Sequence, residues 1–158
     1  MNPDWIDLQR FIREGQAAAT LTSNPMASAL AMRMEQVDIA KGEITLSFEP
    51  QGLFIQGAGV LQGGAVSAML DFAMAFAVMA TLPAGQSCAT SSLNIAFLRP
   101  APKGRYVAVG ETERRGKVLA FTRARLYQEG ASERVVATAT SLLALFQIEA
   151  KPGFVAGP

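Results

Sequence analysis

Residues 63–82 have the sequence GGAVSAMLDFAMAFAVMATL, a stretch of 20 residues that carries a single charge, Asp71. By length alone such a segment could span a bilayer. An aspartate near its centre would cost about 2.5 to 3.5 kcal/mol there, however, and Pro83 ends the segment. We therefore predict a helix that is buried on nearly all sides inside a soluble assembly, and we expect no membrane partner.

The overall composition predicts one folded domain. The chain has 158 residues, of which 50% are hydrophobic and 17% are charged, and this composition is too apolar for a disordered chain. The formal net charge of +1 provides no strong field to hold nucleic acid, so we expect no nucleic-acid partner. Residues 1–5, MNPDW, lack the basic start of a signal peptide, which favours a cytoplasmic location.

The residue types that the chain lacks exclude several kinds of site. It has no histidine, which excludes Ser-His and Cys-His nucleophile pairs, histidine general bases and histidine-ligated zinc. Cys88 is the single cysteine, which excludes an intrachain disulfide and CxxC motifs. We expect no metal, and the chemistry must use carboxylates, hydroxyls, amides, lysine or backbone dipoles.

The patterning along the chain predicts an α+β fold. Residues 1–29 are expected to form a short amphipathic helix and a connector, residues 30–147 the main domain, and residues 148–158 a tail. Alternating apolar and polar residues predict strands around Met32–Met34, Ile44–Phe48, Leu93–Phe97, Gly104–Arg114, Lys117–Gln128 and Glu133–Phe146. Short connections between the last three strands require antiparallel neighbours.

A sheet must cover its apolar face, and the helix at residues 63–82 is the only large apolar element available for this. The economical arrangement is an antiparallel sheet curled around one long central helix, with the short N-terminal helix outside it. The two outer strands would remain as edges, so we expect a homodimer or a dimer of dimers that covers them.

Asp71 is the most informative residue of the central helix. On a helix it shares a stripe of small residues with Gly64, Ser67, Ala68 and Ala75, which indicates close approach by another helix or a ligand. A charge is rarely buried without a partner, and no lysine or arginine of this helix offers one. Asp71 is therefore either a functional base or nucleophile, or a structural residue at a subunit contact.

The start of the same helix is a second candidate site. Glycines at positions 63 and 64 expose the first amide groups, where the helix dipole favours developing negative charge; close backbone packing is the alternative explanation. Gly63 and Asp71 are eight residues apart, about 12 Å along a helix, so they cannot serve the same carbonyl within one subunit. Two antiparallel helices across a two-fold axis would bring them together.

Residues 56–71, QGAGVLQGGAVSAMLD, together with residues 92–101, SLNIAFLRPA, resemble the PaaI-type hotdog-fold acyl-CoA thioesterases. The resemblance covers residues 30–147. It implies hydrolysis of an acyl-CoA thioester to a free acid and coenzyme A, which is part of the substrate, so no separate cofactor is expected. It also implies that the Gly63 amide polarises the thioester carbonyl while Asp71 of the partner subunit attacks it or activates water.

The resemblance implies roles for further residues and shows two departures. Gln62 stands where the family has a histidine, and Gln56 stands where it has an asparagine that is thought to position the water or the thioester. Thr90 falls near a family serine or threonine that assists the nucleophile. The candidates for substrate binding are Gly64, Ser67 and Ser91, and, for the phosphates of coenzyme A, Arg99, Lys103, Arg114, Arg115 and Lys117. These basic residues have an alternative explanation as solvated turn charges.

Two other functions remain open from the sequence. Gln56 and Gln62 are compatible with a non-catalytic module that binds an acyl group or acyl-CoA, and Asp71 could merely stabilise a structural oligomer. A hotdog-type dehydratase is disfavoured, because that chemistry uses a histidine.

Overall fold

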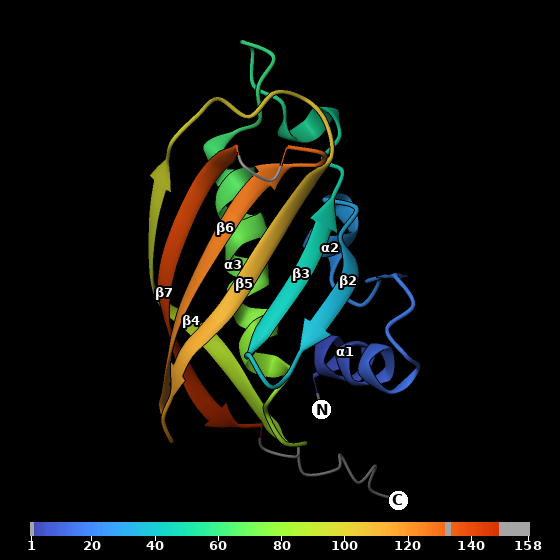
Figure 1. The fold of residues 1–158 in the computed structure, drawn as a ribbon, viewed down its shortest axis with the longest axis vertical. Coiled ribbons are helices and arrows are strands. Elements are labelled where there is room, and N and C mark those ends of the chain that lie inside the picture. The colour runs from blue at the N-terminus through green and yellow to red at the C-terminus, as the bar shows by residue number, and fades with distance from the viewer. Residues whose placement is uncertain (1, 132–133, 149–158) are drawn as a thin grey trace, which may run out of the picture.

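The computed structural model describes residues 2–131 and 134–148. Within these ranges a seven-stranded antiparallel sheet curls around one long helix, α3, while the short helix α1 packs near the lower end of the molecule (Figure 1). The helices are α1 (Pro3–Arg13), α2 (Pro25–Ala29), the 3-10 helix η1 (Gly52–Phe54) and α3 (Gly63–Met79). The strands are β1 (Ala19–Thr20), β2 (Arg33–Asp38), β3 (Glu43–Phe48), β4 (Gln86–Phe97), β5 (Tyr106–Arg115), β6 (Leu119–Gln128) and β7 (Val135–Gln147). The predicted α+β architecture is therefore confirmed.

α3 forms the centre of the hydrophobic core because almost all of its residues are apolar. Met69, Leu70 and Met74 are fully buried in the middle of the helix, against the inner face of the sheet. The strands turn alternate residues inward, as β6 does with Ala124 and Leu126. Among the described residues no helix is both long and apolar enough to cross a membrane.

The strand order is β1-β2-β3-β5-β6-β7-β4, so β4 lies at the far edge from β1 (Figure 1). Its 12 residues pair antiparallel with β7, and within residues 2–131 and 134–148 no strand pairs with its other side. β4 is also much longer than the predicted strand around Leu93–Phe97. The alternating pattern did not predict its first part, Gln86–Ser92, because this part is rich in small polar residues. A long edge strand of this kind is ready to pair with another chain.

The N-terminal segment is built into the same core as the rest of the fold. Leu8 and Phe11 of α1 are buried, and β1 pairs with β2. The indole Nε1 of Trp5 donates a hydrogen bond of 3.0 Å to the main-chain oxygen of Leu82, just beyond the end of α3. Residue 133 of the last predicted strand and residues 149–158 of the predicted tail lie outside the described residues.

Candidate active site

The carboxylate of Asp71 lies in the middle of α3 and faces β4. Thr90 Oγ1 donates a hydrogen bond of 2.7 Å to Asp71 Oδ1. Asp71 is half-buried, whereas Thr90 is exposed on the edge strand. No lysine or arginine among the described residues forms an ion pair with Asp71. The hydroxyl therefore orients one carboxylate oxygen and leaves the charge itself uncompensated.

An irregularity in β4 lies directly at this contact. The register with β7 shifts between Thr90 and Ser92, so that Thr90 faces Leu143 and Ser92 faces Leu142. Ser91 is the extra residue of this bulge and is exposed. Bulges change the direction in which side chains point and are common next to functional sites. Because of this bulge, the alternation of side chains up to Thr90 does not continue in step into the strand after Ser92.

The start of α3 exposes main-chain amides, as the sequence predicts. Gln62 is the N-cap residue with an extended backbone, and its side chain makes no capping hydrogen bond. Gly63 and Gly64 are exposed, and their amide groups have no acceptor within the described part of the chain. Ser67 Oγ donates to the main-chain oxygen of Gly63 at 2.8 Å, so this candidate binding residue is bonded to its own helix. Free amides at a helix start can donate hydrogen bonds to an anionic oxygen.

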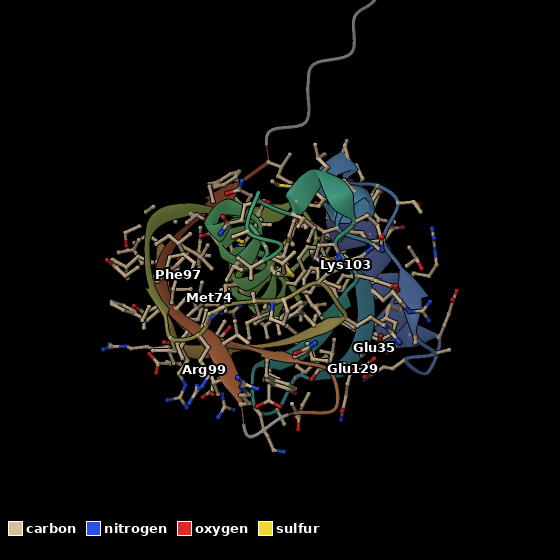
Figure 2. The ribbon with its side chains drawn as sticks, turned by 90° about the horizontal axis from the view of Figure 1, so that it is seen from above. Glu35, Met74, Phe97, Arg99, Lys103 and Glu129 are labelled. Atoms are coloured by element: carbon tan, nitrogen blue, oxygen red, sulfur yellow. The ribbon has the colours of Figure 1, made fainter. Side chains whose placement is uncertain are left out.

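A cleft of about 400 Å³ opens beside this helix start. Gln56 and Gly63 both line it, together with the segment that follows β4, including Phe97 and Arg99. Figure 2, which views the molecule from above, shows Phe97 and Arg99 on the same side of the molecule. Arg99 Nη1 donates a hydrogen bond of 2.5 Å to the main-chain oxygen of Val135. The tertiary fold thus gathers three of the predicted site residues, Gln56, Gly63 and Arg99, at one cleft.

The five basic residues proposed for a phosphate patch do not come together within one subunit. Arg99 lies beside the start of α3, whereas Arg115 Nη1 donates to the main-chain oxygen of Thr81, beyond the other end of that helix. The 17 residues of α3 separate these ends by about 25 Å. Arg114 and Lys117 belong to the β5–β6 turn region with Arg115. β5 runs along the length of α3 and carries its last residues to the far end, so the single patch does not form within one subunit. The fifth residue, Lys103, follows β4 before β5 begins and lies apart from Arg99 in Figure 2.

Cys88 lies close enough to Asp71 to sense its charge. Burial, and secondarily the negative charge of Asp71, raise the pKa of the Cys88 thiol to about 11. The thiol is therefore protonated at neutral pH and is not a second nucleophile. Around Asp71 the groups suited to catalysis are thus a carboxylate and a hydroxyl. No cluster of metal-ligating side chains was found in the described residues.

Comparison with solved structures identifies the family. The chain is 34% identical to a phenylacetic acid degradation-related protein from Ralstonia eutropha JMP134; the match covers 87% of this chain and 98% of that one, with a TM-score of 0.75. The chain belongs to the thioesterase superfamily. The family model described as thioesterase superfamily also matches residues 58–135 of this hotdog thioesterase. A search of curated proteins found no match to this chain.

More distant structures share the hotdog fold. A thioesterase family protein from Silicibacter pomeroyi is 23% identical over 90% of this chain and 98% of its own, with a TM-score of 0.74. A thioesterase from Haemophilus influenzae is 18% identical over 83% and 89%, with a TM-score of 0.73. Membership in the superfamily supports the hydrolysis of acyl thioesters as the general chemistry of this protein.

The sequence-based reasoning missed two features of the site. One is the bulge at Ser91, which leaves no sequence signal beyond a run of small polar residues. The other is Phe97, which the alternating pattern marks only as an apolar strand residue, although its ring lies against Gly63 at the cleft.

Proposed function

We propose that this thioesterase hydrolyses acyl-CoA to a free acid and coenzyme A, with Asp71 as the nucleophile or general base. The observation that carries the proposal is the hydrogen bond from Thr90 to Asp71. It holds the only charged side chain of α3 with one oxygen bonded and the other, Oδ2, free of any partner among the described residues. A carboxylate held in this way can attack a carbonyl carbon or take a proton from water.

The two roles of Asp71 lead to different intermediates. As a nucleophile, Asp71 bonds to the acyl carbon, the thiolate of coenzyme A leaves, and water cleaves the resulting anhydride. As a general base, Asp71 accepts a proton from water while that water attacks the acyl carbon. In one turnover in ¹⁸O-labelled water, attack of water on the aspartyl carbonyl of the anhydride places label in the carboxylate of Asp71, and general-base catalysis never does, so label in Asp71 demonstrates the nucleophilic route.

The amide of Gly63 is the proposed oxyanion donor. It has no acceptor in the described residues and carries no side chain that would block a ligand. A positive helix dipole end and a free amide stabilise the negative charge that develops on the thioester oxygen. Gln62 and Gln56 lie at the same helix start and cleft, where their amides can bond the substrate or a water.

The proposed site is shared between two subunits of a homodimer, with a dimer of dimers as an extension of the same assembly. Gly63 and Asp71 of one α3 are about 12 Å apart, too far for one carbonyl to contact both. In the part of the chain that the structure describes, one edge of β4 pairs with no strand, and a second copy can continue the sheet there. A two-fold axis there would let each helix start serve the other subunit's Asp71.

Substrate binding and location belong to the same proposal. Arg99 lines the cleft beside Gly63, whereas Arg115 and Lys117 lie beyond the other end of α3, where they are the candidates for contact with the phosphates of coenzyme A. No cofactor is required beyond the coenzyme A of the substrate, and we propose a cytoplasmic site of action.

A complementation experiment with two inactive variants tests this proposal. Asp71→Asn keeps the shape of the side chain and removes its basicity. Gly63→Pro removes the amide donor at the first helical residue, where proline is well accommodated after the extended Gln62. Gly63→Ala is the matched control, since it keeps the amide and its Cβ would lie 3.5 Å from the ring of Phe97, an ordinary contact.

We expect Asp71→Asn and Gly63→Pro each to lower kcat by about 10² or more, while Gly63→Ala stays active. When equal amounts of the two variants are refolded together, about half of the dimers are mixed, and each mixed dimer has one of its two shared sites intact. About a quarter of wild-type activity should therefore return. Failure of the mixture to regain activity would contradict a shared site. Near-full turnover of Asp71→Asn would make this residue structural.

Non-catalytic binding of acyl-CoA is the second candidate, and the observation that favours it is Gln62 at a helix start where the family has a histidine. Saturable binding of acyl-CoA by the wild-type protein without any turnover would support this alternative over hydrolysis.

A further inference from the structure

The cleft beside Gly63 has walls that are mostly apolar. Its volume of about 400 Å³ lies within the usual range for small-molecule sites. Val60, Val66, Leu98 and Val136 are among its lining residues, and the polar side chains that reach it are those of Gln56 and Arg99. The cleft is therefore suited to an apolar group that needs few hydrogen bonds.

Phe97 links this cleft to the proposed oxyanion donor. Atoms Cζ and Cε1 of its ring lie 3.5 and 3.6 Å from the position that a Cβ on Gly63 would occupy. One part of the ring thus packs against the start of α3, yet the residue as a whole is 56% exposed and lines the cleft. An aromatic ring at this place contacts whatever is attached to a carbonyl that is bound at the Gly63 amide.

The chemistry of the cleft distinguishes the two arms of the thioester. The thiol arm of an acyl-CoA contains two amides, and burying an amide without hydrogen-bond partners is costly. The cleft offers only Gln56 and Arg99 as polar side chains, and Arg99 already donates to the main-chain oxygen of Val135. An alkyl or aryl acyl group needs no such partner and gains from contact with the Phe97 ring.

We propose that Phe97 determines the acyl specificity of this enzyme, by packing against an uncharged aryl or alkyl acyl group in the cleft while the thiol arm leaves in another direction. This inference rests on the proposed function, since it assumes that the carbonyl binds at the Gly63 amide. Phe97 forms one wall of the acyl site next to the reacting carbon.

The test compares kcat/KM across a series of acyl-CoA thioesters for the wild type, Phe97→Ala and Phe97→Leu. Acetyl-CoA, hexanoyl-CoA, phenylacetyl-CoA and succinyl-CoA vary the acyl group, and N-acetylcysteamine thioesters of the same acids shorten the thiol arm. Phe121→Ala is the matched control, because Phe121 on β6 is similarly exposed, at 46%, and does not line the cleft.

We expect Phe97→Ala to lower kcat/KM for hexanoyl-CoA and phenylacetyl-CoA by about tenfold, with a change of about threefold or less for acetyl-CoA. Phe97→Leu should lower kcat/KM for phenylacetyl-CoA more than kcat/KM for hexanoyl-CoA. Phe121→Ala should have the same kcat/KM values as the wild type. Both thiol arms should give the same pattern.

Two results for the Phe97 variants would overturn the inference while hydrolysis itself stands. One is an equal loss of kcat/KM for every acyl group. The other is a loss of kcat/KM that depends on the thiol arm and not on the acyl group, which would place the thiol arm against Phe97. A wild type that hydrolyses none of the thioesters would instead remove the proposed function, and this inference with it. A denaturation curve for each Phe97 variant establishes that it is folded.

Discussion

Gly110 of β5 lies directly against the main-chain carbonyl of Ala73 in α3. A Cβ placed on Gly110 would stand 2.2 Å from that oxygen and 3.0 Å from the Cβ of Ala73. The neighbouring atoms are mostly helix backbone, which cannot swing away as a long side chain can. This contact sets how closely α3 approaches the sheet, two residues along the helix from Asp71.

Gly110→Ala should therefore destabilise the protein strongly. Helix and sheet must separate to admit the methyl group, and we expect a loss of about 3 kcal/mol or more in the free energy of unfolding. Chemical denaturation measures it. Gly52→Ala is the control, because a Cβ on Gly52 meets no atom within 4 Å; equal stability of the two variants would show that the contact relaxes freely.

Loss of the hydroxyl at position 90 should slow the reaction without unfolding the protein. Thr90 is exposed, and its bond to Asp71 is charge-assisted, so Thr90→Ala should lower kcat about tenfold or more. Thr90→Ser keeps the donor and should retain most activity. Thr140→Ala, at another exposed strand position, should behave as the wild type. Unchanged kcat in Thr90→Ala would assign this hydrogen bond a purely structural role.

The pH profile of kcat/KM should show no limb that belongs to an imidazole. Asp71 is the only ionisable group in the proposed mechanism, and Gln62 cannot titrate. Gln62→His should give equal or higher activity and add a limb to the profile at about pH 6.5, the ordinary pKa of histidine. Gln51→His, at an exposed loop position, should leave the profile unchanged. An identical profile for Gln62→His would place residue 62 away from the reacting carbonyl.

The free energy of unfolding should fall at alkaline pH because of the buried thiol of Cys88. Burial raises the pKa of its thiol from 9.0 to about 11 in the folded state, so the folded chain holds the proton more tightly than the unfolded chain. The resulting stabilisation is fully present below pH 9 and is lost as the pH rises to about 11; two pKa units correspond to about 2 to 3 kcal/mol.

Urea denaturation between pH 8 and about pH 11 measures this loss. Burial also raises the pKa of Tyr106, which adds its own alkaline dependence, so the difference between the wild type and Cys88→Ser isolates the thiol. Parallel stability curves for the two proteins would contradict the prediction.

The parts of this protein that local sequence predicts are those whose physical cause is local. A twenty-residue apolar run that starts with two glycines specifies a buried helix, and helix geometry alone places Gly63 and Asp71 too far apart to act within one subunit. Alternating residues joined by short turns likewise specify the antiparallel strands β5, β6 and β7.

The remaining features depend on contacts between distant segments. Thr90 reaches Asp71 across 19 residues because β4 crosses to the far edge of the sheet and bulges at Ser91, and neither the crossing nor the bulge has a local signature. Strand direction also carried Arg115 to the opposite end of α3 from Arg99, against the single patch that the sequence suggested. Spacing along one helix follows from backbone geometry. Strand order and register follow from the packing of the whole sheet around α3, and that packing also forms the cleft beside Gly63.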